Sequence, residues 1–214
     1  MAGVTRGVLG GSFDPVHLGH VAAAEAALRL RRLEGVFLIP AGLAPHKAPG
    51  AAPFEDRLAM ARLAAGSHPG LDVLDLEGRR PGPSYTVDTL AELRRAYPGA
   101  GFELLVGADM LLDLPSWHRA EDVVRAAQVV AFGRPGSASE TARKAFDAAF
   151  GPGRHVWLDF EPLPVSSTDV RRRLAAGQPV TGLLDPAVEA FIRGRGLYGT
   201  GPRQEARESR GMGG

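Results

Sequence analysis

The 214-residue chain contains no cysteine, which excludes disulfides, thiolate metal sites and cysteine nucleophiles. No apolar run approaches the roughly 20 residues that a bilayer span needs, and residues 1–6 lack the apolar core of a secretory signal. The formal charge is only +1, whereas a nucleic-acid binder normally carries a clear positive excess. We therefore expect a cytoplasmic protein that binds neither membranes nor nucleic acid.

Hydrophobic residues make up 44% of the chain and charged residues 23%, as in ordinary globular proteins. The length suffices for one sizeable core. We expect a single domain over residues 1–200. Residues 201–214 are rich in glycine and charge without periodicity, which predicts a disordered tail.

Apolar runs alternate with helical patterns along the whole chain. The runs that predict strands are residues 7–10, 36–40, 71–76, 102–106, 128–132 and 156–160. The segments that predict helices are residues 18–32, 54–65, a stretch from about 86 to 97, 121–127, 139–150, 170–176 and 185–193. This order indicates an α/β fold, a Rossmann-like doubly wound parallel sheet with helices on both faces and a small C-terminal helical part. Loops after the strands then meet at one edge, where such folds bind ligands.

The first of these loops, residues 10–20, has the properties of a phosphate site. Gly10 and Gly11 allow the backbone to approach a bound group, and the helix start that follows offers unpaired N–H groups to an anion. His17 and His20 are three residues apart and share one helical face. Two other interpretations are a pair of structural histidines and a metal site. No carboxylate at suitable spacing completes a metal site.

A second candidate lies near the other end of the chain, at residues 166–171. Ser166, Ser167 and Thr168 are good helix caps, and one of them is expected to serve only as a cap. Three successive hydroxyls followed by Arg171 exceed what capping requires. Hydroxyls with a guanidinium group form a good phosphate site, so this stretch is a candidate for a second phosphate-binding element.

Between these two stretches the chain carries weaker signals. Trp117, beside Pro115 and Ser116, fits either the core or the face of a planar ring. Thr86 is either the cap of a helix or, with Tyr85, part of a ligand pocket. The pair His46-Lys47, in a loop rich in proline and glycine, is either a ligand site or an ordinary solvated loop.

The motifs carry a family resemblance. Residues 10–20, GGSFDPVHLGH, closely resemble the G-x-F-D-P-x-H-x-G-H signature of the nucleotidyltransferases related to class I aminoacyl-tRNA synthetases, and residues 166–171, SSTDVR, resemble their second signature. His46-Lys47, residues 84–90, residues 107–109, Trp117 and residues 134–136 resemble bacterial nicotinate-nucleotide adenylyltransferases, as does the ending at residues 191–198. The resemblance covers roughly Arg6 to Tyr198. One departure is Ala44-Pro45, where the family often has two prolines.

The resemblance implies adenylyl transfer from ATP to the 5′-phosphate of nicotinate mononucleotide, which gives deamido-NAD and pyrophosphate, with Mg²⁺ bound alongside ATP and no metal ligands from the protein. The implied catalytic residues are His17, His20, Lys47 and Arg171. The implied ATP-binding residues are Gly10, Gly11, Ser12, Phe13, His17, Gly19, His20, Gly107, Asp109, Arg134, Ser166, Ser167, Thr168 and Arg171. The implied mononucleotide-binding residues are Ser12, Asp14, His46, Lys47, Tyr85, Thr86 and Trp117.

Several related activities compete with this one. Phosphopantetheine adenylyltransferases are usually shorter and lack the Ser-Tyr-Thr and tryptophan features, and cytidylyltransferases have a different second signature. Preference for nicotinamide mononucleotide is a closer alternative. A non-catalytic nucleotide sensor is a further one, although a sensor has no need of His17, His20 and Arg171. Monomer and homo-oligomer both remain open.

Overall fold

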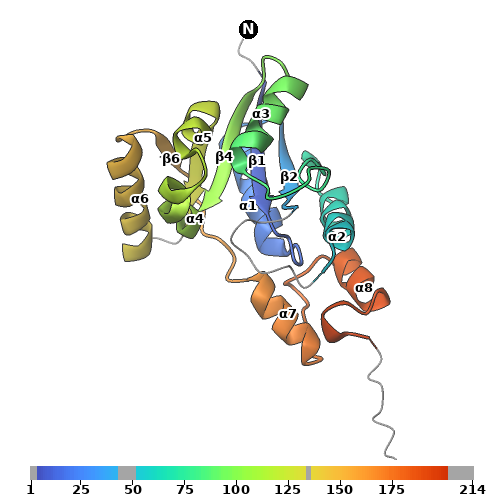
Figure 1. Ribbon diagram of the computed structural model, residues 1–214. Coiled ribbons are helices and arrows are strands. Elements are labelled where there is room, and N and C mark those ends of the chain that lie inside the picture. Colours follow the sequence, from blue (N-terminus) through green and yellow to red (C-terminus); the bar gives the residue numbers. More distant parts are fainter. Residues whose placement is uncertain (1–3, 43–51, 134–135, 202–214) are drawn as a thin grey trace, which may run out of the picture.

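The computed structural model describes residues 4–42, 52–133 and 136–201. Six parallel strands form one sheet in the order β3-β2-β1-β4-β5-β6 (Figure 1). The strands are β1 (Thr5–Gly11), β2 (Gly35–Pro40), β3 (Leu71–Val73), β4 (Gly101–Gly107), β5 (Gln128–Phe132) and β6 (His155–Trp157). This is the strand order of a doubly wound fold, so the predicted architecture is confirmed.

Helices cover both faces of the sheet, with α1 and α3 on opposite faces (Figure 1). One core cluster contains residues of α1 (Leu18–Leu30), α2 (Phe54–Gly66), α7 (Ser167–Ala175) and α8 (Pro186–Gly194). The other contains residues of α3 (Thr86–Ala96), α4 (Ala108–Asp113), α5 (Ala120–Ala126) and α6 (Ser137–Phe150). Two short 3₁₀ helices, η1 (Leu114–Ser116) and η2 (Leu197–Gly199), complete the structure.

Neighbouring residues of the central strands enter different clusters. Leu9 and Leu38 pack on the side of α1 and α2, whereas Val8 and Phe37 pack on the side of α3. Successive side chains of a strand point to opposite faces, and here both faces are covered. The central strands therefore appear in the sequence as continuous apolar runs without polar alternation.

The sequence misplaced the edge strands. β3 ends at Val73 and β6 ends at Trp157, instead of reaching residues 76 and 160. Each pairs with one neighbour over only three residues, although the neighbouring strands β2 and β5 are longer. The segment after Gly107 contains the short helix α4, which the sequence did not predict, and Pro115 lies in the 3₁₀ helix that follows, where its missing N–H costs little.

The strand order reverses between β1 and β4, and crevices open at such a point beyond the carboxyl ends of the strands. α7 and α8 lie beyond this end of the sheet, at the bottom of Figure 1. No helix formed by the described residues is long and apolar enough to cross a membrane. The predicted tail lies, apart from Gly201, outside the described residues.

Candidate active site

A cavity of about 830 Å³ lies at this reversal point. We call it the phosphate cavity. It brings together residues from both signature stretches and from the end of β4, which are Gly10, Gly11, Ser12, Asp14, His17, Gly19, His20, Gly107, Asp109, Ser166, Ser167, Thr168 and Arg171. Phe13, expected to bind ATP, does not line the cavity: it is fully buried, and its ring contacts His20, which does line it.

His17 and His20 stand at the start of α1, as their spacing predicts. Their rings stack with centroids 3.6 Å apart, and Phe13 packs edge-on against His20 at 4.9 Å. The backbone N–H of His17 donates to Nδ1 of His20 at 3.2 Å. Because that nitrogen accepts a hydrogen bond, the proton of the neutral His20 ring lies on Nε2. Nε2 is therefore a donor.

His17 is buried, with 8% of its surface exposed. Burial lowers its pKa to about 4, because charging an imidazole away from water is unfavourable. His17 is thus neutral at pH 7, and its ring can hydrogen-bond a ligand without carrying charge. Gly19 permits this packing, since a Cβ there would lie 2.7 Å from Val165 and 3.0 Å from the His17 ring.

The two signature stretches are hydrogen-bonded to each other. The hydroxyl of Ser167 donates to the carbonyl of Pro15 at 2.9 Å, and Nη1 of Arg171 donates to the carbonyl of Asp14 at 2.6 Å. Ser166 is the cap of α7 and accepts from the N–H of Asp169 at 3.1 Å. One of the three hydroxyls is therefore a cap, as predicted.

A buried arginine that the sequence analysis missed supports the glycine loop. Arg57 donates to the carbonyls of Ser12 at 2.7 Å, Gly42 at 3.3 Å and Ala52 at 3.3 Å. Burial lowers the pKa of Arg57. The sequence did hold a signal for the burial of Arg57. Arg57 lies four residues before Ala61, so both belong to the face of α2 that is buried.

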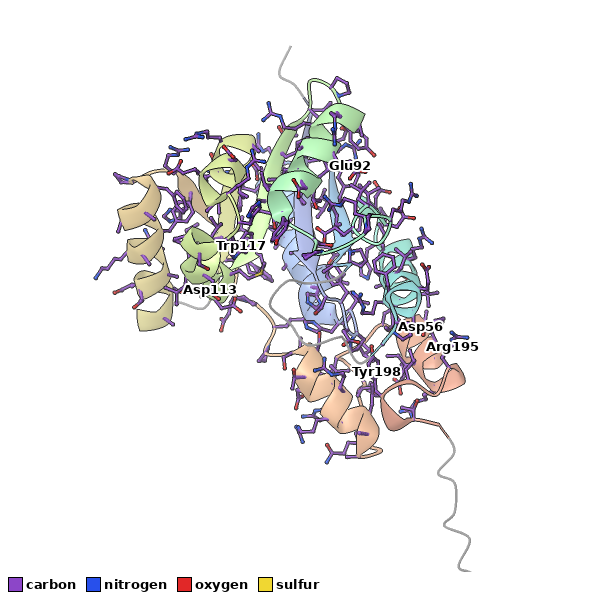
Figure 2. The ribbon with its side chains drawn as sticks, viewed as in Figure 1. Asp56, Glu92, Asp113, Trp117, Arg195 and Tyr198 are labelled. Atoms are coloured by element: carbon purple, nitrogen blue, oxygen red, sulfur yellow. The ribbon has the colours of Figure 1, made fainter. Side chains whose placement is uncertain are left out.

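A second cavity of about 240 Å³ adjoins the first. We call it the ring cavity. It brings together Tyr85, Thr86 and Trp117, all expected at the mononucleotide, together with Glu77, Thr89 and His118, which were not expected. Trp117 lies next to α4 (Figure 2), and the Tyr85 and His118 rings lie 4.3 Å apart. The other residues that line the ring cavity are mostly apolar, which suits the binding of a flat ring.

The residues that line both cavities are Gly10, Gly11, Ser12, Ala41 and Met110. Of these, Ser12 was predicted to touch both substrates. Asp14, predicted at the mononucleotide, lines the phosphate cavity, and its Oδ1 accepts from the Tyr198 hydroxyl at 2.7 Å and the Ala52 N–H at 3.2 Å.

The ring cavity is also where α3 begins. Its cap is Tyr85, so Thr86 is the first helical residue and the interpretation of Thr86 as the cap is wrong. The Tyr85 side chain accepts no hydrogen bond from the first turn of α3, and backbone N–H groups at a helix start can bind an acceptor.

Glu77 forms a buried polar network beneath the same cavity. The Thr89 hydroxyl donates to its carboxylate at 2.7 Å, and Nη2 of Arg80 lies 3.8 Å away. Burial raises the pKa of Glu77.

Three predicted site residues, His46, Lys47 and Arg134, lie outside the described residues. Across residues 4–42, 52–133 and 136–201, no three His, Asp or Glu side chains form a group able to hold a metal ion.

Comparisons with known proteins agree with this arrangement. The cytidylyltransferase-like family model matches residues 8–173. A probable nicotinate-nucleotide adenylyltransferase of Roseiflexus sp. (strain RS-1) is 42% identical over 92% of this chain and all of its own length. Another from Aeromonas salmonicida (strain A449) is 42% identical over 90% of this chain and 96% of its own.

The fold is also found among solved structures. Plasmodium falciparum nicotinic acid mononucleotide adenylyltransferase complexed with NaAD superposes with a TM-score of 0.74 at 19% identity, covering 92% of this chain and 98% of its own. The chain, a nucleotidyltransferase, belongs to the nicotinate-nucleotide adenylyltransferase family.

Proposed function

We propose that this chain transfers the adenylyl group of ATP to the 5′-phosphate of nicotinate mononucleotide, a step of NAD biosynthesis. An oxygen of the mononucleotide phosphate forms a bond to the α-phosphorus of ATP as the bond from that phosphorus to pyrophosphate breaks. The observation that carries the proposal is the shared wall of the two cavities, Gly10 to Ser12. A triphosphate in the phosphate cavity can therefore meet the phosphate of a mononucleotide whose ring lies in the ring cavity.

The nucleophile in this reaction is already anionic, so no general base is required. Catalysis then consists of holding the phosphates in line and stabilising the charge that develops on them. We assign this work to His17, His20 and Arg171, with Nε2 of His20 donating to the α-phosphate. Ser166, Ser167, Thr168 and Gly19 bind the other phosphates. Lys47, outside the described residues, adds positive charge.

The remaining assignments follow from the cavity walls. Gly107 and Asp109, at the start of α4, meet the adenosine, with the Asp109 carboxylate accepting from ribose hydroxyls. Arg134 belongs beside the adenine. The pyridine ring occupies the ring cavity against Trp117, and N–H groups at the start of α3 receive its carboxylate.

Mg²⁺ fits this site as an ion carried by ATP. The described residues form no cage of three or more ligands, and Mg²⁺ usually binds phosphate oxygens, water and one or two carboxylates. The ion neutralises phosphate charge. Because the reaction consumes ATP, we also propose a cytoplasmic location.

One assay tests the function. The chain is incubated with ATP, Mg²⁺ and nicotinate mononucleotide, and pyrophosphate release is followed, with nicotinamide mononucleotide and 4′-phosphopantetheine as parallel acceptors. We expect the fastest release with nicotinate mononucleotide. Faster release with another acceptor would correct the substrate, and no release with any acceptor would contradict the enzymatic role.

A further inference from the structure

Tyr198, close to the chain end, adopts a backbone conformation that its residue type disfavours. It lies in η2 with φ 54° and ψ 33°, in the left-handed region where a bulky residue is an outlier. Such conformations persist only where the surroundings hold them, and they gather at functional sites. Tyr198 lies beside α7 and α8 (Figure 2).

Its side chain reaches Asp14, a residue that lines the phosphate cavity. The Tyr198 hydroxyl donates to Oδ1 of Asp14 at 2.7 Å, although the two residues are 184 positions apart. Asp14 is 4% exposed, and the same Oδ1 accepts from the N–H of Ala52 at 3.2 Å. Burial and the hydrogen bond to Asp14 raise the pKa of Tyr198, so its hydroxyl remains a donor.

Asp14 presents two acceptors to Arg171. Nη1 of Arg171 lies 2.6 Å from the main-chain carbonyl of Asp14 but 3.8 Å from carboxylate Oδ2. A charge-assisted bond between a guanidinium group and a carboxylate is stronger than a bond to a neutral carbonyl. Arg171 and the Asp14 carboxylate thus form a long ion pair, and a small rotation of the carboxylate would shorten it and further reduce the positive charge that Arg171 presents to the cavity.

We infer that Tyr198 is a positioning residue, which keeps the Asp14 carboxylate from closing further on Arg171, so that more of the guanidinium charge acts on the ATP phosphates. The inference rests on the proposed function, in which Arg171 binds those phosphates. Tyr198 then influences nucleotide binding through Asp14, without itself contacting ATP.

The test is the Tyr198→Phe substitution, which removes one oxygen and keeps the ring. Binding of ATP with Mg²⁺ is measured by titration calorimetry on the full chain, without a mononucleotide. We expect the Kd for ATP to rise about tenfold, the equivalent of one lost charge-assisted interaction. The matched control is Tyr97→Phe at the end of α3, whose ring packs on Phe37 at 5.2 Å. Its Kd for ATP should not change.

Two further variants separate positioning from a general loss of structure. Adding Asp14→Asn to Tyr198→Phe should restore much of the ATP affinity, since a neutral amide competes weakly for Arg171. In an Arg171→Gln background, Tyr198→Phe should have little further effect, because residues that act through one another give non-additive changes. Circular dichroism verifies that each variant is folded.

Unchanged ATP affinity in Tyr198→Phe would overturn the inference, as would additive losses with Arg171→Gln or a failure of Asp14→Asn to rescue. Should Tyr198→Phe fail to fold, Asp14→Asn alone decides: it should tighten ATP binding, and weaker binding would overturn the inference. A wild-type chain that binds ATP but releases no pyrophosphate contradicts the proposed function alone.

Discussion

The phosphate cavity and the ring cavity are built in different ways. The phosphate cavity joins the two ends of the chain, and its parts are connected by hydrogen bonds such as Ser167 to Pro15 and Arg171 to Asp14. The ring cavity is lined by aromatic and apolar side chains from the middle of the chain, with Tyr85 against His118.

This difference predicts that phosphate recognition and ring recognition respond differently to the substitution of a single side chain. Phosphate recognition depends on donors held at set positions, so loss of one donor affects the reaction steeply. Ring recognition depends on contact area, which falls gradually as a side chain is altered. The predictions below test this comparison.

We expect the largest effect at His20. His20→Ala removes the Nε2 donor, which should lower kcat about 10²-fold or more while the protein stays folded. The measurement is steady-state pyrophosphate release together with thermal unfolding. His68→Ala is the control, because His68 pairs with Glu25 at 2.7 Å on the surface. A near-normal rate for His20→Ala would make this histidine structural and remove the basis of the comparison.

The second prediction concerns Arg57, whose hydrogen bonds hold the loop that follows β1 beside the phosphate cavity. Arg57→Met leaves the carbonyls of Ser12, Gly42 and Ala52 without this donor, which should reduce the free energy of unfolding by about 3 kcal/mol. Urea unfolding measures the loss. Arg62→Met, an exposed arginine of the same helix, should change stability by less than about 0.5 kcal/mol. Equal effects would show that the Arg57 contacts are dispensable.

These contacts also show what the sequence could and could not predict. Residues 166–171 form a short motif whose backbone folds locally, so a cap among its three hydroxyls followed from residue order. The spacing of His17 and His20 likewise put them together at the start of α1, but it did not predict that their rings stack or that Gly11 belongs to β1. The apolar runs predicted the central strands because strands covered on both faces consist almost entirely of apolar residues. The end of β6 could not be predicted, because it depends on the three residues that pair with β5.

The bond between Tyr198 and Asp14 was equally out of reach, because it joins residues that meet only in the folded chain. For the ring cavity, the sequence alone left Tyr85, Thr86 and Trp117 ambiguous, and only the family resemblance gave them a substrate. Glu77 carried no local signal, since its burial depends on the packing of α3 against the sheet.

Burial of His17 makes stability depend on pH. Its pKa is about 4 in the folded protein and 6.5 in a free side chain. As pH falls from 6.5 towards 4, the unfolded chain takes up a proton that the folded protein does not, so stability decreases, by about 2 kcal/mol between pH 7 and pH 5. Glu77 acts in the opposite direction, because its raised pKa makes the folded protein the better proton acceptor.

The contribution of His17 is isolated by His17→Gln, compared with wild type by urea unfolding at pH 7 and pH 5. The variant should lose about 2 kcal/mol less than wild type over this interval. Equal losses of unfolding free energy in the two proteins would contradict a lowered pKa for His17. His17 would then carry a positive charge in the phosphate cavity at pH 5.

The smallest effect is expected in the ring cavity. Trp117→Ala removes an aromatic face but no phosphate donor, so the KM for nicotinate mononucleotide should rise about five- to tenfold while the KM for ATP changes little. Both values come from initial rates of pyrophosphate release, with each substrate varied in turn.

Trp117→Phe is the matched control for this variant. A phenyl ring keeps a flat apolar surface, so it should retain most of the mononucleotide affinity, in line with recognition by contact area. A rise in the KM for ATP with an unchanged KM for the mononucleotide would instead put Trp117 on the adenosine side. The ring cavity would then lose its assigned substrate, and the division between the two cavities would have to be redrawn.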